Sequence, residues 1–282
     1  MAVVLIISPH LDDACLSFGA QMASYTSAGH HVLVHTVFAG SPIPPFSPSA
    51  DRYHRAWGIT GDPVAPRREE DLRAMQLLGA TSSHGDFLDA IYRRDEQGDW
   101  LVQPGSRPHT RFMPEEPHLS EAITARITAL VEDHAPALVA TAAAVGTHVD
   151  HQRARDSTIA ACRATGAELR LWEDLPYALW TNEISPLPDR TVLTDRRIAA
   201  CGKEAREHKY LAAAAYASQL PGLVYEGAGL FDLLDRRWSG LADEGAEAPY
   251  GEVVWTATDT SGQSRRADAD AREGDPSDAP GL

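Results

Sequence analysis

The sequence contains few cysteines and few basic residues for its length. Its 282 residues include three cysteines, none close to another in the chain: Cys15, Cys162 and Cys201. Such a set does not form a disulfide framework, so we expect a protein of the reducing cytoplasm. The 25 basic residues face 40 acidic ones, which gives a net charge of −15. Because nucleic acids and anionic membranes bind basic patches, this balance argues against both as main partners.

A long hydrophobic run and a secretory leader are also missing. The apolar segment 1–8 is too short to span a bilayer and has no basic region or cleavage site, so we interpret it as a buried strand and expect no membrane insertion. The turn after this strand has no Gly-x-Gly-x-x-Gly, which argues against a dinucleotide site. The apolar fraction of 43% suits a soluble globular protein. The oligomeric state stays open, and a homo-oligomer is one option.

Apolar, β-branched runs alternate with segments of helical periodicity. Strands are predicted over residues 3–7, 31–38, 137–143 and 169–172, and helices over 12–28, 67–78, 151–165 and 203–217, with another helix starting at Ser120. A short strand over 86–91 and a last edge strand over 253–257 are also predicted. This alternation predicts an α/β fold with right-handed crossovers, here a Rossmann-like three-layer α/β/α arrangement with a mostly parallel sheet. We expect residues 1–257 to form a single domain.

Two long connections and a polar tail interrupt this pattern. Residues 41–66 are rich in proline, and residues 93–118 are polar and also contain prolines. Long connections in a compact domain are usually functional, so both are predicted to be loop insertions at the rim of a site. Residues 258–282 contain almost no large apolar side chain, which predicts a disordered tail.

Polar residues follow the first predicted strand in the order Ser8-Pro9-His10-Leu11-Asp12-Asp13. The carboxyl edge of an open α/β sheet is where ligands bind. His10 and Asp13 lie three residues apart across a tight turn, so both can face one point above the sheet. The alternative is that Asp12 and Asp13 only cap the next helix and complement its dipole.

A second polar cluster, Gly146-Thr147-His148-Val149-Asp150-His151, follows the strand predicted over 137–143. Two strand ends on one sheet edge can converge, and then two imidazoles and a carboxylate can hold one metal ion. If they do not converge, His148 and His151 are ordinary surface histidines. Such a ligand set suits both a catalytic zinc site and a non-haem Fe(II) oxygenase. Asp12 favours zinc hydrolysis, because it can act as a base beside a metal-bound water.

These motifs resemble those of the LmbE-like, or PIG-L, N-deacetylases. The family's Pro-His-Pro-Asp-Asp and His-Pro-Asp-His appear here as Pro9-His10-Leu11-Asp12-Asp13 and His148-Val149-Asp150-His151. Its Arg-x-x-Glu before a helix that ends in Leu-Gly appears as Arg67-Arg68-Glu69-Glu70 with Leu78-Gly79. The resemblance covers roughly residues 1–180. It implies a deacetylase that acts on an N-acetyl amino sugar, a glycoside or a related small metabolite, in keeping with secondary metabolism.

The resemblance also implies a role for each motif residue. One Zn²⁺ ion, or Fe²⁺ or another divalent metal, would be held by His10, Asp13 and His151. Asp12 would be the general base. His148 would stabilise the oxyanion or protonate the leaving amine, and Asp150 would orient His148.

Four more residues are predicted to contact the substrate: Arg67, Asp89, Glu173 and Tyr177. The resemblance gives Arg67 a contact with a substrate hydroxyl, and the alternative is a surface arginine at a helix start. Glu173 and Tyr177 follow a predicted strand and line either the pocket or a solvated loop. Some relatives carry a tyrosine where this chain has Gly146, so a phenol beside the oxyanion must come from elsewhere, with Tyr177 and Tyr92 as candidates, or be absent.

Three other functions stay open at this stage. The first is an amidase that acts on another N-acyl substrate, such as a thiol conjugate. The second is a non-haem Fe(II) oxygenase, which metal analysis and a test of oxoglutarate and oxygen dependence would reveal. The third is a non-catalytic metal-binding α/β protein, which would have no use for Asp12.

Overall fold

A computed structural model describes residues 1–224, 227–244 and 250–260. The strands are β1 (Val3–Ser8), β2 (His31–Thr36), β3 (Thr81–His84), β4 (Leu138–Ala142), β5 (Leu169–Trp172), β6 (Thr191–Ala200) and β7 (Gly251–Asp259). The α-helices are α1 (Asp13–Ser27), α2 (Pro48–Trp57), α3 (Ala65–Leu77), α4 (Pro117–His134), α5 (Val149–Thr165), α6 (Lys203–Ala213) and α7 (Leu230–Asp243). Short 3₁₀ turns are η1 (Ala90–Tyr92), η2 (Tyr177–Leu179) and η3 (Leu220–Gly222).

One seven-stranded sheet runs through the molecule in the order β3-β2-β1-β4-β5-β7-β6. The first five strands in this order are parallel, and β7 pairs antiparallel with both β5 and β6. After β1 the chain forms β2 and β3 on one side of that strand, and it then returns to form β4 on the other side. The direction in which strands are added therefore reverses between β1 and β4. Such a reversal opens a crevice at the carboxyl ends of the two strands, where both polar motifs lie.

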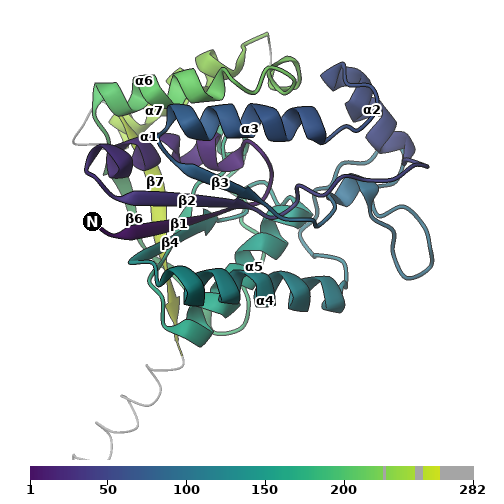
Figure 1. Ribbon diagram of the computed structural model, residues 1–282, viewed down its shortest axis with the longest axis horizontal. Helices are drawn as coiled ribbons and strands as arrows, with labels where there is room; N and C mark the ends of the chain where they lie inside the picture. The colour runs from purple at the N-terminus through teal and green to yellow at the C-terminus, as the bar shows by residue number, and fades with distance from the viewer. Residues whose placement is uncertain (225–226, 245–249, 261–282) are drawn as a thin grey trace, which may run out of the picture.

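Helices cover both faces of the sheet, with α1, α3, α6 and α7 on one side and α4 and α5 on the other (Figure 1). Alternation along β1 explains the two layers, because Val4 and Ile6 pack into one core and Leu5 and Ile7 into the other. A third cluster, which includes Leu11, lies under the loops beyond the strand ends. This architecture confirms the predicted α/β fold with a mostly parallel sheet.

Several elements differ from the sequence prediction. Residues 86–91 do not form a strand: β3 lies earlier in the chain, and Ala90 and Ile91 belong to the 3₁₀ turn η1. The strand predicted over 253–257 exists but is not at an edge, because β6 covers it. The segment 41–66 contains α2, and β6 and α7 were not predicted. Most of the predicted disordered tail, residues 261–282, lies outside the described residues.

All three cysteines are free and buried, as expected for a chain without a disulfide framework. Among the described residues, no helix is both long enough and apolar enough to cross a bilayer.

Candidate active site

The turn after β1 brings His10 and Asp13 together. Ser8 Oγ donates to the carbonyl oxygen of His10 (2.7 Å) and accepts from the N–H of Ala14 (3.1 Å), which closes the turn onto the first residues of α1. The carboxylate of Asp13 accepts from the main-chain N–H of His10 at 2.8 Å. The two side chains therefore face the same point at the carboxyl end of β1.

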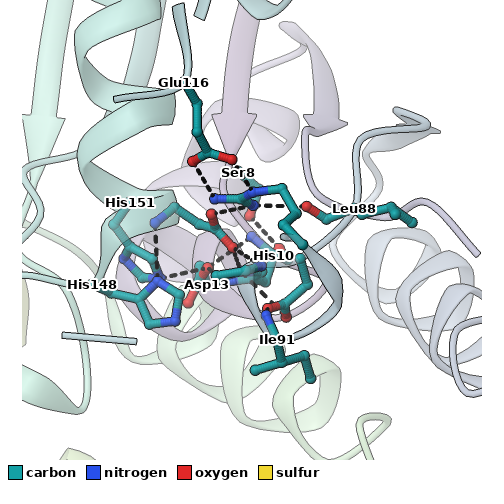
Figure 2. A network of polar contacts seen from close by, with 12 residues as sticks. Ser8, His10, Asp13, Leu88, Ile91, Glu116, His148 and His151 are labelled. Atoms are coloured by element: carbon teal, nitrogen blue, oxygen red, sulfur yellow. Dashed lines mark hydrogen bonds and ion pairs between the residues drawn. The ribbon is translucent and has the colours of Figure 1, made fainter. Parts of the chain in front are cut away.

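The second motif, at the start of α5, brings its imidazoles to that same point. Asp13 Oδ2 lies 3.2 Å from His10 Nδ1 and 3.1 Å from His151 Nε2. His148 completes the group, since ring nitrogens of the three histidines lie within 4.8 Å of one another. Figure 2 shows His10, Asp13, His148 and His151 gathered in this way. The two clusters therefore converge, and these histidines are buried rather than surface residues.

The far nitrogens of two imidazoles are each held by a buried carboxylate. His10 Nε2 donates to Asp150 Oδ2 at 3.1 Å, and His151 Nδ1 donates to Asp174 Oδ1 at 2.6 Å. In the neutral imidazoles the lone pairs then lie on the nitrogens that face Asp13. Each of these two nitrogens lies within about 3.2 Å of Asp13 Oδ2, and three electron-rich atoms so close to one centre need a positive charge between them. His151 Nε2 is also a buried nitrogen without a hydrogen-bond partner. This donor set fits a divalent metal with carboxylate–histidine support.

The side chain of Asp150 does not orient His148 in the way the sequence suggested. Its carboxylate is taken by His10, by Arg93 Nη1 at 2.7 Å and by the N–H of Ala90 at 2.8 Å. His148 instead accepts a hydrogen bond at Nδ1 from the main-chain N–H of Asp150, because it is the N-cap of α5. A neutral His148 consequently carries its proton on Nε2 and offers a donor.

Asp12 does not cap the helix that follows it. It occupies the N-cap position of α1, yet its side chain makes no cap hydrogen bond, and it lines the cavity described below. Burial, together with repulsion from Asp13, raises the pKa of Asp12 to about 6 against the pull of Arg67. The capping interpretation therefore does not account for this residue, and its carboxyl is available as a base.

The charges around the site favour a cation. Burial opposes ionisation, but the carboxylate of Asp13 overcomes it and raises the pKa of His151 to about 9. Burial is likewise overcome at His10, where Asp89, Asp13 and Asp150 hold the pKa well above its ordinary value. The pKa of Asp13 lies well below its ordinary value despite its burial, because His151 and His10 stabilise the carboxylate.

Behind the site, a chain of buried ion pairs fixes Asp150. Arg93 binds Asp150 and donates twice to Glu116, at 2.8 and 3.1 Å, and Arg153 of α5 binds the same Glu116 at 3.0 Å. Figure 2 shows Glu116 at the top of this network and Leu88 at its right, with His10 and Asp13 below them. Sequence analysis missed Arg93 and Glu116, because both lie in the 93–118 connection, where no spacing marks them.

A cavity of about 510 Å³ opens over the site. Three of the predicted substrate contacts, Arg67, Asp89 and Tyr177, line it together with Asp12, Asp13, His10 and His148. Glu173 does not line the cavity: it forms a bidentate ion pair with Arg237 of α7, at 2.6 and 2.8 Å, so its carboxylate is committed to packing that helix. Its neighbour Asp174 is the acid that reaches the site, and only its place before a proline at a strand end marks it in the sequence.

Gly146 makes room for Tyr177. The glycine has a φ of +86°, and a Cβ placed on it would lie 2.8 Å from Tyr177 Cβ. The ring of Tyr177 lies 5.7 Å from that of His151. The position that carries a tyrosine in some relatives is thus covered by a tyrosine from a later segment. Tyr92 lies elsewhere, with its hydroxyl bonded to His54.

The comparisons with known proteins agree with this geometry. The family model PIG-L, described as GlcNAc-PI de-N-acetylase, matches residues 5–162. The 2'-N-acetylparomamine deacetylase of Streptomyces fradiae is 31% identical over 62% of this chain and 57% of that protein. The 1D-myo-inositol 2-acetamido-2-deoxy-alpha-D-glucopyranoside deacetylase of Kribbella flavida is 28% identical over 63% of this chain and 61% of that protein. The chain thus spans about three fifths of the length of these two relatives.

A solved structure matches over more of the chain. The crystal structure of the zinc inhibited form of teicoplanin deacetylase Orf2 has a TM-score of 0.82 and 37% identity, over 92% of this chain and 99% of that one. At 92% of the chain, the likeness extends beyond residue 180, where the resemblance of the sequence motifs ends.

Proposed function

The chain belongs to the PIG-L family, and we propose that it is a metal-dependent N-deacetylase that hydrolyses the acetamide of an N-acetylated amino sugar. The observation that carries this proposal is the convergence of His10, Asp13 and His151 on one point, beside a cavity that Asp12 lines. A metal-ligand set with an adjacent, unused carboxyl group is what hydrolysis by a metal-activated water requires.

We propose zinc as the metal and His10 Nδ1, Asp13 and His151 Nε2 as its ligands. When bound, zinc would polarise the amide carbonyl and lower the pKa of a bound water toward neutrality. The two nitrogens carry lone pairs because Asp150 and Asp174 hold the protons on the opposite side of each ring. Both carboxylates thereby fix the rotation of the rings and raise their basicity.

Asp12 is the proposed general base. Its pKa of about 6 keeps it mostly ionised at neutral pH and still basic enough to take a proton from water. His148 presents a donor, Nε2–H, and is proposed to bind the oxygen of the acetamide as negative charge develops there. An oxygenase would have no use for Asp12, which is why hydrolysis is the better explanation of the site.

The cavity supports an amino sugar carried on a larger molecule. Arg67 and Asp89 are suited to sugar hydroxyls, and Tyr53 and Trp57 of α2 add aromatic surface to the lining of the same cavity. The names of the relatives include an acetylated paromamine, an inositol glycoside and teicoplanin, each larger than a single sugar. We propose a substrate of this kind.

The test is release of free amine from N-acetylglucosaminides and other N-acyl amines by the full-length, zinc-loaded protein. Asp12→Ala should keep its zinc and lose turnover by about 10³-fold or more. Asp13→Ala and His151→Ala should lose zinc. Zinc loss in Asp12→Ala would make Asp12 a ligand, and full zinc occupancy in either of the other variants would refute the ligand set.

A further inference from the structure

A fourth histidine, His109, stands at the wall of the cavity and has no role in the site described so far. It comes from the connection between η1 and α4, which is paired to the second motif like a short strand. His109 and His148 form an antiparallel bridge. Val149 N–H donates to the carbonyl of Pro108 (2.9 Å), and Thr110 N–H to that of Thr147 (3.0 Å).

The side chain of Gln152 in α5 locks this pairing. Its amide group donates to the carbonyl oxygens of Thr110 at 2.6 Å and Thr147 at 2.8 Å. The ring of His109 also meets that of Tyr177 edge to face, with centroids 5.2 Å apart. The long connection is therefore fixed where it reaches the site, and the His109 ring has a defined orientation.

Hydrogen bonding determines which nitrogen of His109 accepts. Its Nδ1 lies 2.7 Å from the carbonyl oxygen of Gly146. A carbonyl only accepts, so the proton of a neutral His109 lies on Nδ1 and the lone pair on Nε2. Burial lowers the pKa of His109 and favours this neutral form. Nε2 is thus an acceptor beside the cavity.

His148 has the opposite polarity. Its Nδ1 accepts from the main-chain N–H of Asp150, so its Nε2 is a donor. The two rings meet edge to face, with centroids 5.1 Å apart and planes at 86°. His148 and His109 therefore offer a donor and an acceptor, each fixed by a main-chain group. A trans secondary amide has the complementary pair, a carbonyl oxygen and an N–H, on opposite edges, so each ring would meet a different edge of the amide.

We propose that His109 Nε2 accepts a hydrogen bond from the N–H of the scissile amide, while His148 binds the carbonyl side. The proposal rests on the proposed deacetylase function and adds a residue that selects amides over esters. An ester has an oxygen in place of the N–H, and its lone pairs would oppose that of His109. No proton is transferred to His109 in this role.

Two variants separate this role from a structural one, because asparagine and glutamine mimic different nitrogens of histidine. His109→Asn keeps a donor at the place of Nδ1, for Gly146, but has no atom at the place of Nε2. His109→Gln puts a carbonyl oxygen near the place of Nε2. We expect kcat/KM on an N-acetylglucosaminide to fall at least about tenfold in His109→Asn and less in His109→Gln. The reverse order would mean that only the bond to Gly146 matters, and would overturn the proposal.

The matched ester, a 2-O-acetyl glucoside, provides a readout that folding defects do not change. The amide-to-ester ratio of kcat/KM is measured within each variant, so a partly inactive preparation cancels. The ratio should fall about tenfold or more in His109→Asn and stay at the wild-type value in His118→Asn, an exposed histidine of α4. An unchanged ratio in His109→Asn refutes the role of His109 alone. A zinc-loaded wild-type protein without activity on any N-acetyl substrate would instead refute the proposed function.

Discussion

Asp174 is buried against His151 and also accepts from the N–H of Val145 at 2.9 Å. Its carboxylate holds the proton of His151 on Nδ1, which leaves the lone pair on Nε2, the nitrogen that faces Asp13. The charge of Asp174 therefore acts on the metal site through His151. We predict that Asp174→Asn, which keeps the size but removes the charge, weakens zinc binding by about 10–100-fold. Competition with a chromophoric zinc chelator measures this. Glu173→Gln is the matched control, since its partner Arg237 lies away from the site, and equal losses in both variants would refute the role of Asp174.

Gly146 gives a second prediction for a single residue. A methyl group there meets Tyr177 and also forces alanine into a left-handed conformation. Gly166, at the end of α5, has a φ of +75° and nothing within 4 Å of the place that a methyl group would take, so it isolates the conformational cost. We expect Gly166→Ala to lower the free energy of unfolding by about 1 kcal/mol. Gly146→Ala should lower it by about 1–3 kcal/mol more and reduce turnover. Urea titration of both variants checks the difference, and equal losses would show that Tyr177 simply moves aside.

Residue by residue, the sequence predicted that the two motifs meet and named three other residues of the cavity, Arg67, Asp89 and Tyr177, but it gave the carboxylate of Asp150 the wrong partner. His10, Asp13 and His151 meet because two strand ends are adjacent, which the order of elements implies. Asp174 and His109 come from segments whose position depends on tertiary contacts, so no spacing in the chain connects them to the motifs. Glu173 was chosen over Asp174 because alternation along an irregular segment does not determine which side chain faces inward.

At the scale of elements, α2 was missed because its prolines were taken as signs of a loop. Pro48 in fact occupies the first turn of the helix, where its missing N–H costs nothing. Ser47 caps the helix by accepting from Ala50 N–H at 2.9 Å, and it donates to the carbonyl of Ile91 at 2.7 Å. The cap therefore joins α2 to η1, which begins directly after Asp89, a residue of the cavity wall.

Loss of this cap should loosen one element more than the whole fold. We predict that Ser47→Ala lowers the local stability of α2 by about 1–2 kcal/mol, because it leaves both the Ala50 N–H and the Ile91 carbonyl without their partner. Hydrogen exchange should quicken over 48–57 and stay unchanged in α5. Uniform exchange in both helices would show that α2 opens only with the whole domain.

The missed strand, β6, has a physical reason for escaping the sequence pattern. β6 is an edge strand, and after its buried first residue, Thr191, its side chains are exposed or half-buried in a pattern without regular alternation. A bulge between Thr194 and Arg197, with Asp195 at a φ of +51°, breaks its periodicity. Charges and bulges protect an edge from pairing with another chain, and they also hide a strand from pattern analysis. The parallel strands, buried on both faces, were all recognised except the polar β3.

For the molecule as a whole, the sheet order explains why the site has two halves. Residues 10–13 and 148–151 reach it from β1 and β4, neighbours in the sheet but far apart in the chain. The two main cores on either face of the sheet depend on this same pairing. Formation of the site is therefore tied to formation of the central sheet, and conditions that weaken the sheet will also disperse the metal ligands.

Acidification is such a condition, through His35 in β2. Its Nδ1 bonds to Ser83 Oγ of β3 at 2.9 Å, and its buried Nε2 has no hydrogen-bond partner. Burial, with Arg126 nearby, lowers the pKa of His35 to about 4. Between about pH 6.5 and about pH 4 the unfolded chain thus binds a proton that the folded protein does not, so the free energy of unfolding must fall as the pH falls. We expect this group to contribute up to about 1.4 kcal/mol per pH unit.

Urea titrations of wild type and His35→Asn at several pH values test this: the variant should be less stable near neutrality yet lose less on acidification. Parallel curves would show that His35 is protonated in the folded protein.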